Sequence, residues 1–317
     1  MRKFCIFLGL LCCLATATAR QKVALVLGGG GAKGAAEVGV LKVIERTGIP
    51  IDLVVGTSIG SIVGGLYSCG YTAAQLDTMF CTQEWLSLLT DRNEEMGTEP
   101  YKVKDGVTYI FGFPVVDLTN NAFGIVRGER IEQLLDSMTG CRRNVAFDSL
   151  RIPFRCVAVD LKTASEEVMS SGRLSRAMRA SMAIPGLYKP VNIDGKMLVD
   201  GGMLNNLPTD VARQLGADVV IAVDLQQAKP KERTFSLKDE LGIGGLLDWI
   251  VSRPDVKKYH ENVKKADIYI HPPLPDYDAS SFGNKNAARM MTIGEREAQK
   301  HWQELMELKE RLKAEAY

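Results

Sequence analysis

The sequence predicts an α/β fold in which a mostly parallel sheet is covered by helices on both faces. Short apolar runs alternate along the chain with stretches of helical periodicity, and the strand candidates are apolar throughout rather than alternately polar. The composition agrees, because 46% of the 317 residues are hydrophobic and 24% are charged, as in ordinary globular proteins. These observations exclude a disordered, collagen-like or coiled-coil chain.

Each expected strand is a short apolar run, and helical patterns separate the strands. The strand candidates are residues 22–27, 52–56, 154–161, 197–199, 219–223 and 268–271. The helix candidates are residues 32–47, 61–67, 129–138, 174–182, 209–215 and 286–314. The last helix is charged, with Trp302 and Leu305 on one side, which favours a docked helix or a face for a partner.

Two stretches do not fit this alternation. Residues 91–126 are rich in Gly, Asn, Asp and Pro, and residues 226–258 are basic, with a leucine-rich, glycine-broken segment at 241–247. Long segments of this kind are often lids or binding loops, so we expect surface insertions. The segment 241–247 and the C-terminal helix are candidate surfaces for a homodimer or for transient contact with a membrane.

The first nineteen residues have the pattern of a secretory signal peptide. Arg2 and Lys3 precede an apolar run over 4–14, and small residues follow at 15–19, where a signal peptidase would cut. The apolar run is shorter than the ~20 residues that a membrane-spanning helix needs. We therefore expect export, with residues 20–317 located in the periplasm, at the outer membrane or in the medium.

The cysteines and histidines suggest neither a disulfide framework nor a metal site, and the charge does not suggest nucleic-acid binding. Beyond residue 19 only Cys69, Cys81, Cys141 and Cys156 remain, and Cys156 lies in an apolar run typical of a buried free thiol. No Cys or His group has the spacing of zinc ligands, so we expect no metal. The formal charge of +1 gives no reason to expect nucleic acid as a partner.

A serine in a strand-to-helix turn is the main candidate for chemistry. Gly56-Thr57-Ser58-Ile59-Gly60 follows an apolar strand and precedes a helical pattern. A sharp turn in this setting exposes a serine hydroxyl as a nucleophile, and the glycines Gly56 and Gly60 permit close backbone approach. The alternative is a tight turn in which Ser58 only caps the helix.

A glycine-rich loop ends the preceding strand and offers backbone N–H groups to an anion at a helix start. A dinucleotide site needs an acid at the end of the next strand, where Gly56 to Ser58 stand instead, and a Walker loop needs Ser or Thr after its lysine. An oxyanion hole beside Ser58 uses both loops, because adjacent parallel strands end at one crevice. The candidate residues are Gly29, Gly30, Gly31, Ala32, Lys33 and Gly34.

Two residues are candidates for the base that Ser58 needs. His271 is the best placed of the three histidines, because it ends a strand and follows the serine in chain order, as in an α/β-hydrolase triad. Asp200 ends an apolar strand and is followed by Gly201 and Gly202. A carboxylate can act as the base where it reaches the serine in a dry site, although D-G-G also occurs in simple turns.

Together, these motifs resemble those of the patatin-like phospholipase family, and most closely its secreted bacterial members. The resemblance covers about residues 22–275. It rests on the glycine loop at 29–34, G-x-S-x-G at 56–60, D-G-G at 200–202, and the intervening segments 160–163, 175–186 and 205–208.

The resemblance implies a three-layer α/β/α domain that works without a cofactor, calcium or a catalytic histidine. It implies that Ser58 attacks an acyl ester, that Asp200 takes the serine proton, and that amides around Gly30, Gly31 and Ala32 hold the oxyanion. Glycerophospholipids or other acyl lipids are the expected substrates. The alternatives are an esterase with a Ser-Asp-His triad, and a lipid-binding envelope domain without activity.

The resemblance also bears on domain organisation and on Lys33. We expect one domain over 20–317, with a core at about 22–275 and a helical extension at about 284–317, since Ser58 and Asp200 must meet. Lys33 either contacts a lipid phosphate or lies in solvent.

Overall fold

A computed structural model describes residues 20–91, 102–104, 107–110, 113–115, 126–140, 143–227 and 256–315. The expected signal peptide, the leucine-rich segment 241–247 and Cys141 lie outside these ranges. Within them, every helix is too short or too polar to span a bilayer. The described cysteines Cys69, Cys81 and Cys156 are free thiols, and Cys156 is fully buried, as expected.

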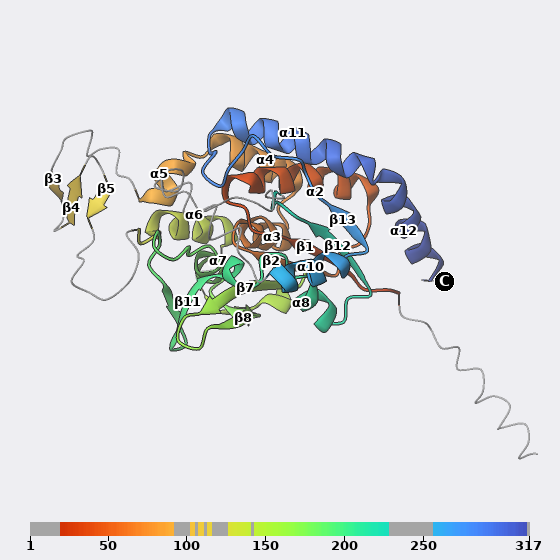
Figure 1. Ribbon diagram of the computed structural model, residues 1–317, viewed down its shortest axis with the longest axis horizontal. Helices are drawn as coiled ribbons and strands as arrows, with labels where there is room; N and C mark the ends of the chain where they lie inside the picture. Colours follow the sequence, from red (N-terminus) through yellow and green to blue (C-terminus); the bar gives the residue numbers. More distant parts are fainter. Residues whose placement is uncertain are drawn as a thin grey trace, which may run out of the picture.

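An eight-stranded sheet lies at the centre of the molecule, in the order β10-β11-β7-β2-β1-β12-β13, with β8 paired to β7 (Figure 1). The strands β7, β2, β1, β12 and β13 run parallel, whereas β8, β11 and β10 run antiparallel to their neighbours. The bounds are β1 Val23–Leu27, β2 Leu53–Thr57, β7 Phe154–Asp160, β8 Ser165–Met169, β10 Val191–Ile193, β11 Lys196–Asp200, β12 Val219–Val223 and β13 Ile268–Ile270.

Small strands lie outside this sheet. The structure has a three-stranded sheet of β3 Lys102–Lys104, β4 Val107–Ile110 and β5 Phe113–Val115, and a pair of β6 Val145–Ala146 with β9 Ser171–Gly172. Short 3-10 helices are η2 Gly31–Gly34, η4 Phe147–Ser149 and η5 Gly201–Met203.

Helices cover both faces of the central sheet. Alternate residues of β1 belong to two separate apolar cores, one of which includes helix residues from α2, α3, α7 and α11, and the other residues from α8 and α10. Since every residue of β1 is buried, the three-layer arrangement follows. The helices are α2 Ala35–Thr47, α3 Ile59–Cys69, α4 Ala73–Thr82, α5 Trp85–Thr90, α6 Glu129–Thr139, α7 Leu174–Ser181, α8 Thr209–Gln214, α10 Val256–Lys264, α11 Asn284–Lys300 and α12 Trp302–Ala314.

The C-terminal part of the chain differs from the single helix expected over 286–314. The helix is interrupted at His301, and α12 docks with Leu305, Leu308 and Leu312 buried. Figure 1 shows both helices in blue: α11 lies along the upper edge of the molecule, beside α2 and α4, and α12 lies at its right-hand end. The apolar face of α12 is therefore covered by the protein itself.

The helices α2 and α11 approach so closely that glycine is required at their crossing. A methyl group on Gly39 would lie 2.0 Å from the carbonyl oxygen of Met291, and one on Gly294 would lie 2.0 Å from that of Ala36. Both obstacles are helix backbone, which cannot move aside as a side chain can. Because α2 follows the glycine loop directly, this crossing also fixes the position of that loop.

We expect Gly294→Ala to destabilise the fold by about 3 kcal/mol, although alanine is the better helix former by about 1 kcal/mol. Thermal unfolding measures the change. The matched control is Gly65→Ala in α3, where the obstacle is the sulfur of the flexible Met178 side chain, 2.6 Å away. Equal unfolding temperatures for the two variants would contradict the inference that helix backbone limits how closely α2 and α11 approach.

Candidate active site

Ser58 lies in the turn between β2 and α3 with φ 54° and ψ −124°, a backbone conformation that costs energy for any residue with a side chain. Hydrogen bonds hold this turn from two sides. The Ser58 N–H donates to Ser181 Oγ at 2.9 Å, and the Ser58 carbonyl accepts from the N–H and the hydroxyl of Ser61, at 2.9 and 2.6 Å. The strained turn therefore presents the Ser58 side chain in one fixed direction.

The flanking glycines permit backbone contacts that a side chain would block. A methyl group on Gly56 would lie 2.4 Å from the carbonyl oxygen of Gly60, and one on Gly60 would lie 2.3 Å from that of Leu27. Helix α3 thus starts directly against the ends of β1 and β2. The turn has no room for a larger residue at either position.

The sheet register brings Asp200 to the same level as Ser58. In β7, Val157 pairs with Thr57 of β2, and the next residue, Ala158, pairs with Asp200 of the antiparallel strand β11. The Ser58 hydroxyl donates to Asp200 Oδ2 at 2.7 Å. The other carboxylate oxygen, Oδ1, accepts the Gly202 N–H at 2.7 Å. Both side chains are almost fully buried.

Glycine is also required immediately after Asp200. A methyl group on Gly201 would lie 2.4 Å from the carbonyl oxygen of Val157, and one on Gly202 would lie 3.0 Å from Asp200 Oδ1. These two glycines let the chain turn tightly around the carboxylate, while the Gly202 N–H orients it.

The end of α7 and the turn that follows it position both residues. Ser181 Oγ accepts the Ser58 N–H and itself donates to the Val157 carbonyl at 2.5 Å, and the Ala183 carbonyl accepts the Asp200 N–H at 2.9 Å. Ser181 and Ala183 both lie in segment 175–186, which carries part of the family resemblance, but no role was predicted for either of them.

Burial raises the pKa of Asp200 to about 6, while the hydrogen bonds from Ser58 and Gly202 act in the opposite direction. At neutral pH the carboxylate is ionised, yet it binds a proton more readily than an ordinary aspartate. A base of this strength beside a hydroxyl suits proton transfer near neutral pH.

The glycine loop has two backbone donors available. Among the described residues, the N–H groups of Gly30 and Gly31 have no hydrogen-bond acceptor. These two donors are fewer than the six loop residues, 29–34, that the sequence predicted. The last of the six, Gly34, leads into α2. The other loop amides donate within the fold: Gly28 to Val223, Gly29 to Asn206, Ala32 to Ala279 and Lys33 to Gly30, at 2.9 to 3.3 Å. The expectation that the Ala32 amide is available to an oxyanion is therefore wrong.

Lys33 is only 4% exposed and interacts electrostatically with Asp278. Of the two expectations for Lys33, a side chain in solvent is therefore wrong. The segment around Ala279 covers the glycine loop, since a methyl group on Gly31 would lie 2.4 Å from the Ala279 carbonyl oxygen.

None of the histidines is positioned as the partner of Ser58. His271 Nε2 lies 2.5 Å from the Gln226 carbonyl oxygen, after the edge strand β13. Two strands separate β13 from β2, which corresponds to roughly 14 Å across the sheet. His260 is exposed on α10, and His301 pairs with Glu304. The structure thus does not form the alternative triad with His271.

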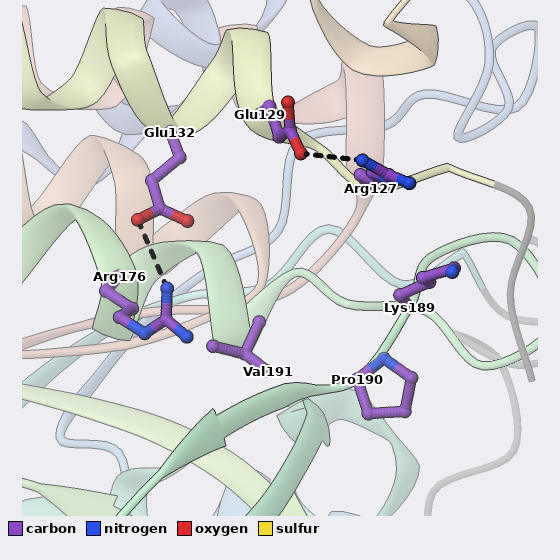
Figure 2. A pocket seen from close by; sticks show the side chains of 7 residues that line it. All are labelled: Arg127, Glu129, Glu132, Arg176, Lys189, Pro190 and Val191. Carbon is purple, nitrogen blue, oxygen red and sulfur yellow. Dashed lines mark hydrogen bonds and ion pairs between the residues drawn. The ribbon is translucent and has the colours of Figure 1, made fainter. Parts of the chain in front are cut away.

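A separate polar depression of about 320 Å³ lies between α6, α7 and the start of β10 (Figure 2). Figure 2 shows Arg176 directed towards Glu132, and Arg127 towards Glu129. Neither Ser58 nor Asp200 lines this depression. Within the described part of the chain, no group of three or more His, Cys, Asp or Glu residues is arranged to hold a metal ion.

The raised pKa of Asp200 has a consequence for stability. Because the folded pKa lies above the ordinary value of 3.8, the stability that Asp200 contributes is present below pH 4 and is lost as the pH rises through 6. We expect Asp200→Asn to raise the unfolding temperature relative to wild type by a few degrees at pH 8, and by less at pH 5.

Calorimetry from pH 4 to pH 8 tests this dependence. The control is Asp148→Asn, because a hydrogen bond from Arg155 lowers the pKa of Asp148. Its carboxylate stabilises the wild type above pH 4, so this variant should be the less stable of the two from pH 5 to pH 8, opposite in sign to Asp200→Asn. A difference between wild type and Asp200→Asn that does not change with pH would contradict the raised pKa.

The sequence matches the family model of patatin-like phospholipases over residues 25–213. Over 294 residues it is 36% identical to patatin-like phospholipase domain-containing protein 6 of Homo sapiens, covering 85% of this chain and 20% of that protein. It is 30% identical to lysophospholipase nte1 of Emericella nidulans over 284 residues, covering 83% of this chain and 17% of the relative.

Among solved structures, VipD from Legionella pneumophila aligns with a TM-score of 0.46 at 13% identity, covering 90% of this chain and 67% of that one. The chain spans about a fifth of the length of the curated relatives named above. The match to the family model extends from β1 into α8 and includes Ser58 and Asp200. This chain therefore belongs to the patatin-like phospholipase family.

Proposed function

We propose that the protein is a serine acyl hydrolase that cleaves fatty-acyl esters of membrane glycerophospholipids. The observation that carries this proposal is the 2.7 Å hydrogen bond from Ser58 Oγ to the buried Asp200 carboxylate. Next to it lie two loop amides, of Gly30 and Gly31, for which the described part of the chain offers no acceptor. Membership of the family supports a lipid ester as the substrate, and one relative is named a lysophospholipase.

In the first half of the reaction, the Ser58 oxygen bonds to the ester carbonyl carbon while its proton moves to Asp200. The carbonyl electron pair moves to oxygen, and this oxyanion accepts hydrogen bonds from the Gly30 and Gly31 N–H groups. Each such donor is worth about 3 kcal/mol in other enzymes. The proton then passes from Asp200 to the leaving alcohol oxygen as the ester C–O bond breaks.

In the second half, water adds to the carbonyl carbon of the acyl-enzyme and transfers a proton to Asp200. The bond to Ser58 Oγ breaks, the proton returns to the serine, and the fatty acid leaves. Two helices begin at the site: α3, and α2 with the short η2 before it. Each presents its positive end to the developing negative charge.

The proposed site needs one domain over residues 20–317. Ser58 and Asp200 are 142 positions apart and yet share a hydrogen bond, and the helical extension packs closely on α2. A phospholipid substrate implies transient contact with a membrane surface. A homodimer stays a prediction, and since the apolar face of α12 is buried, that face is not its surface.

Incubation with a fluorophosphonate probe, together with mass spectrometry of products from defined mixed-chain phospholipids, tests the activity. We expect labelling of Ser58 and release of fatty acid in the wild type. Ser58→Ala should lower turnover at least a thousandfold and Asp200→Asn at least a hundredfold, because the nucleophile or its base is lost. The value of kcat/KM should rise as the pH passes 6, as Asp200 ionises.

His271→Gln is the control in this experiment, and we expect it to retain activity within about twofold. Loss of activity in this variant, with Asp200→Asn still active, would favour the triad esterase instead. A folded wild type that neither reacts with the probe nor releases fatty acid would favour a lipid-binding domain without activity.

We also propose that residues 1–19 direct export and that the mature chain begins at Arg20. In support, the Arg20 guanidinium is already paired with the Asp52 carboxylate at 2.5 and 3.0 Å, so cleavage before it leaves the new terminus anchored.

Cell fractionation and N-terminal sequencing of the full chain, expressed with a C-terminal tag in a bacterial host, test the export proposal. The expected product is extracytoplasmic and starts at or near Arg20. A variant with Asp in place of Leu8 and Leu10 should stay in the cytoplasm with its full N-terminus. An uncleaved cytoplasmic wild type would refute export by this segment.

A further inference from the structure

We propose that Asn206 is a positioning residue that aims one of the two oxyanion donors, the N–H of Gly30, by holding the carbonyl of Gly29. This inference rests on the proposed function and extends it to a residue outside the Ser58–Asp200 pair. Asn206 follows the D-G-G turn and is 1% exposed.

Asn206 binds both polar backbone groups of Gly29. Its side-chain Nδ2 donates to the Gly29 carbonyl at 3.0 Å, and its own carbonyl accepts the Gly29 N–H at 3.1 Å. Only the NH2 group of the amide can donate to a carbonyl, so the orientation of the Asn206 side chain is determined. Gly29 is thereby held at two points by one residue.

The carbonyl of Gly29 and the N–H of Gly30 belong to the same peptide group. A trans peptide is planar, and its C=O and N–H point in opposite directions; the described chain has no cis peptide. A bond that fixes the Gly29 oxygen therefore fixes the direction of the Gly30 hydrogen. Without it, a peptide between two glycines rotates at little cost, because glycine has no Cβ to restrict it.

The second donor is held differently. The Gly31 N–H shares its peptide with the Gly30 carbonyl, which accepts the Lys33 N–H at 3.3 Å within the turn of η2. Local structure therefore orients Gly31, whereas Gly30 depends on a residue 176 positions away along the chain from it. The Gly30 donor is thus the one that Asn206 can control.

Packing places Asn206 between the two halves of the site. A methyl group on Gly29 would lie 2.2 Å from Asn206 Oδ1 and 3.1 Å from Ser58 Cβ. One on Gly202 would lie 2.7 Å from the same Oδ1 and 3.0 Å from Asp200 Oδ1. A single short segment, 200–206, therefore carries the base and holds the glycine loop.

The amide is not explained by packing alone. Among the described residues, Asn206 Oδ1 is buried and has no hydrogen-bond partner, and an unpaired buried acceptor costs stability. An apolar side chain of similar shape would avoid that cost at Oδ1 but would lose the bond to Gly29. The neighbouring Asn205 differs, because its side chain is bonded to Glu166, Asp210 and Asn262, away from Gly29.

Kinetics of Asn206→Asp and Asn206→Leu on a defined phospholipid test the proposal. We expect kcat to fall about 10- to 100-fold, which is no more than the fall caused by removing a whole oxyanion donor. We expect KM to change by less than about threefold. Rates are normalised to the number of sites that react with fluorophosphonate, so partial unfolding does not lower them.

A transition-state analogue supplies the readout that a structural role would not move. A fatty-acyl trifluoromethyl ketone accepts the Ser58 oxygen at its carbonyl carbon and forms a hemiketal oxyanion, while the serine proton moves to Asp200. We expect its inhibition constant to weaken in the Asn206 variants by about the same factor as kcat/KM falls. Equal factors would show that the loss is in oxyanion stabilisation.

The matched control is Asn262→Ser, which removes a comparably buried amide that bonds to Asn205, Leu207 and Asp210. It should lower the unfolding temperature and leave the inhibition constant within twofold of wild type. All three Asn206 variants keep the backbone bond to Gly29. Asn206→Ser, which has the smallest side chain, replaces Asn206→Asp and Asn206→Leu if they prevent folding.

Wild-type kcat and inhibition constants in the Asn206 variants would overturn the proposal. So would weakening of the inhibitor by the same factor in Asn262→Ser, because the effect would then be general destabilisation. A wild type that does not label at Ser58 would instead defeat the proposed function, so the two failures are distinguishable.

Discussion

The hydrogen bond between Ser58 and Asp200 is the interaction on which the site depends, because it joins two distant segments through buried groups. It forms only if β2 and β11 present these residues at one level, and β7 between them sets that level through Val157 and Ala158. The last residue of α7, Ser181, and the nearby Ala183 then bond to the backbone of both residues. The central sheet and one helix end together determine the distance between the Ser58 hydroxyl and the Asp200 carboxylate.

The site stores two unfavourable features that the rest of the fold must offset. Ser58 has a strained backbone, and Asp200 carries a charge in a dry environment, which raises its pKa. Strain of this kind persists only where the surroundings leave no alternative conformation. Here the glycines of the three loops let backbone pack directly on backbone, so the turn cannot relax by shifting.

Much of the fold could be predicted because its strands are continuously apolar and its helices have clear periodicity. Val23–Leu27 and Val219–Val223 are examples, buried along their whole length. The strand β8 and helix α10 were missed, since their residues are largely polar. The position of β8 depends on its pairing with β7, and that of α10 on its packing against α8. Helix α4 was missed although its capping box, Thr72 with Gln75, was readable in the sequence.

For the site, sequence alone determined which residue types stand at the ends of the strands: a serine between glycines, an acid before two glycines, and a glycine-rich helix start. These are local patterns, and local backbone geometry requires them. The residues by themselves left Asp200 and His271 open as the partner of Ser58, and only the family resemblance favoured Asp200. The tertiary structure shows Ser58 bonded to Asp200, and shows which loop amides are already bonded within the fold. The reason is physical: the bond from Ser58 to Asp200, and the bonds from the Gly29 and Ala32 amides to Asn206 and Ala279, join segments more than a hundred residues apart. Such pairings exist only once the sheet has set its strand order and register.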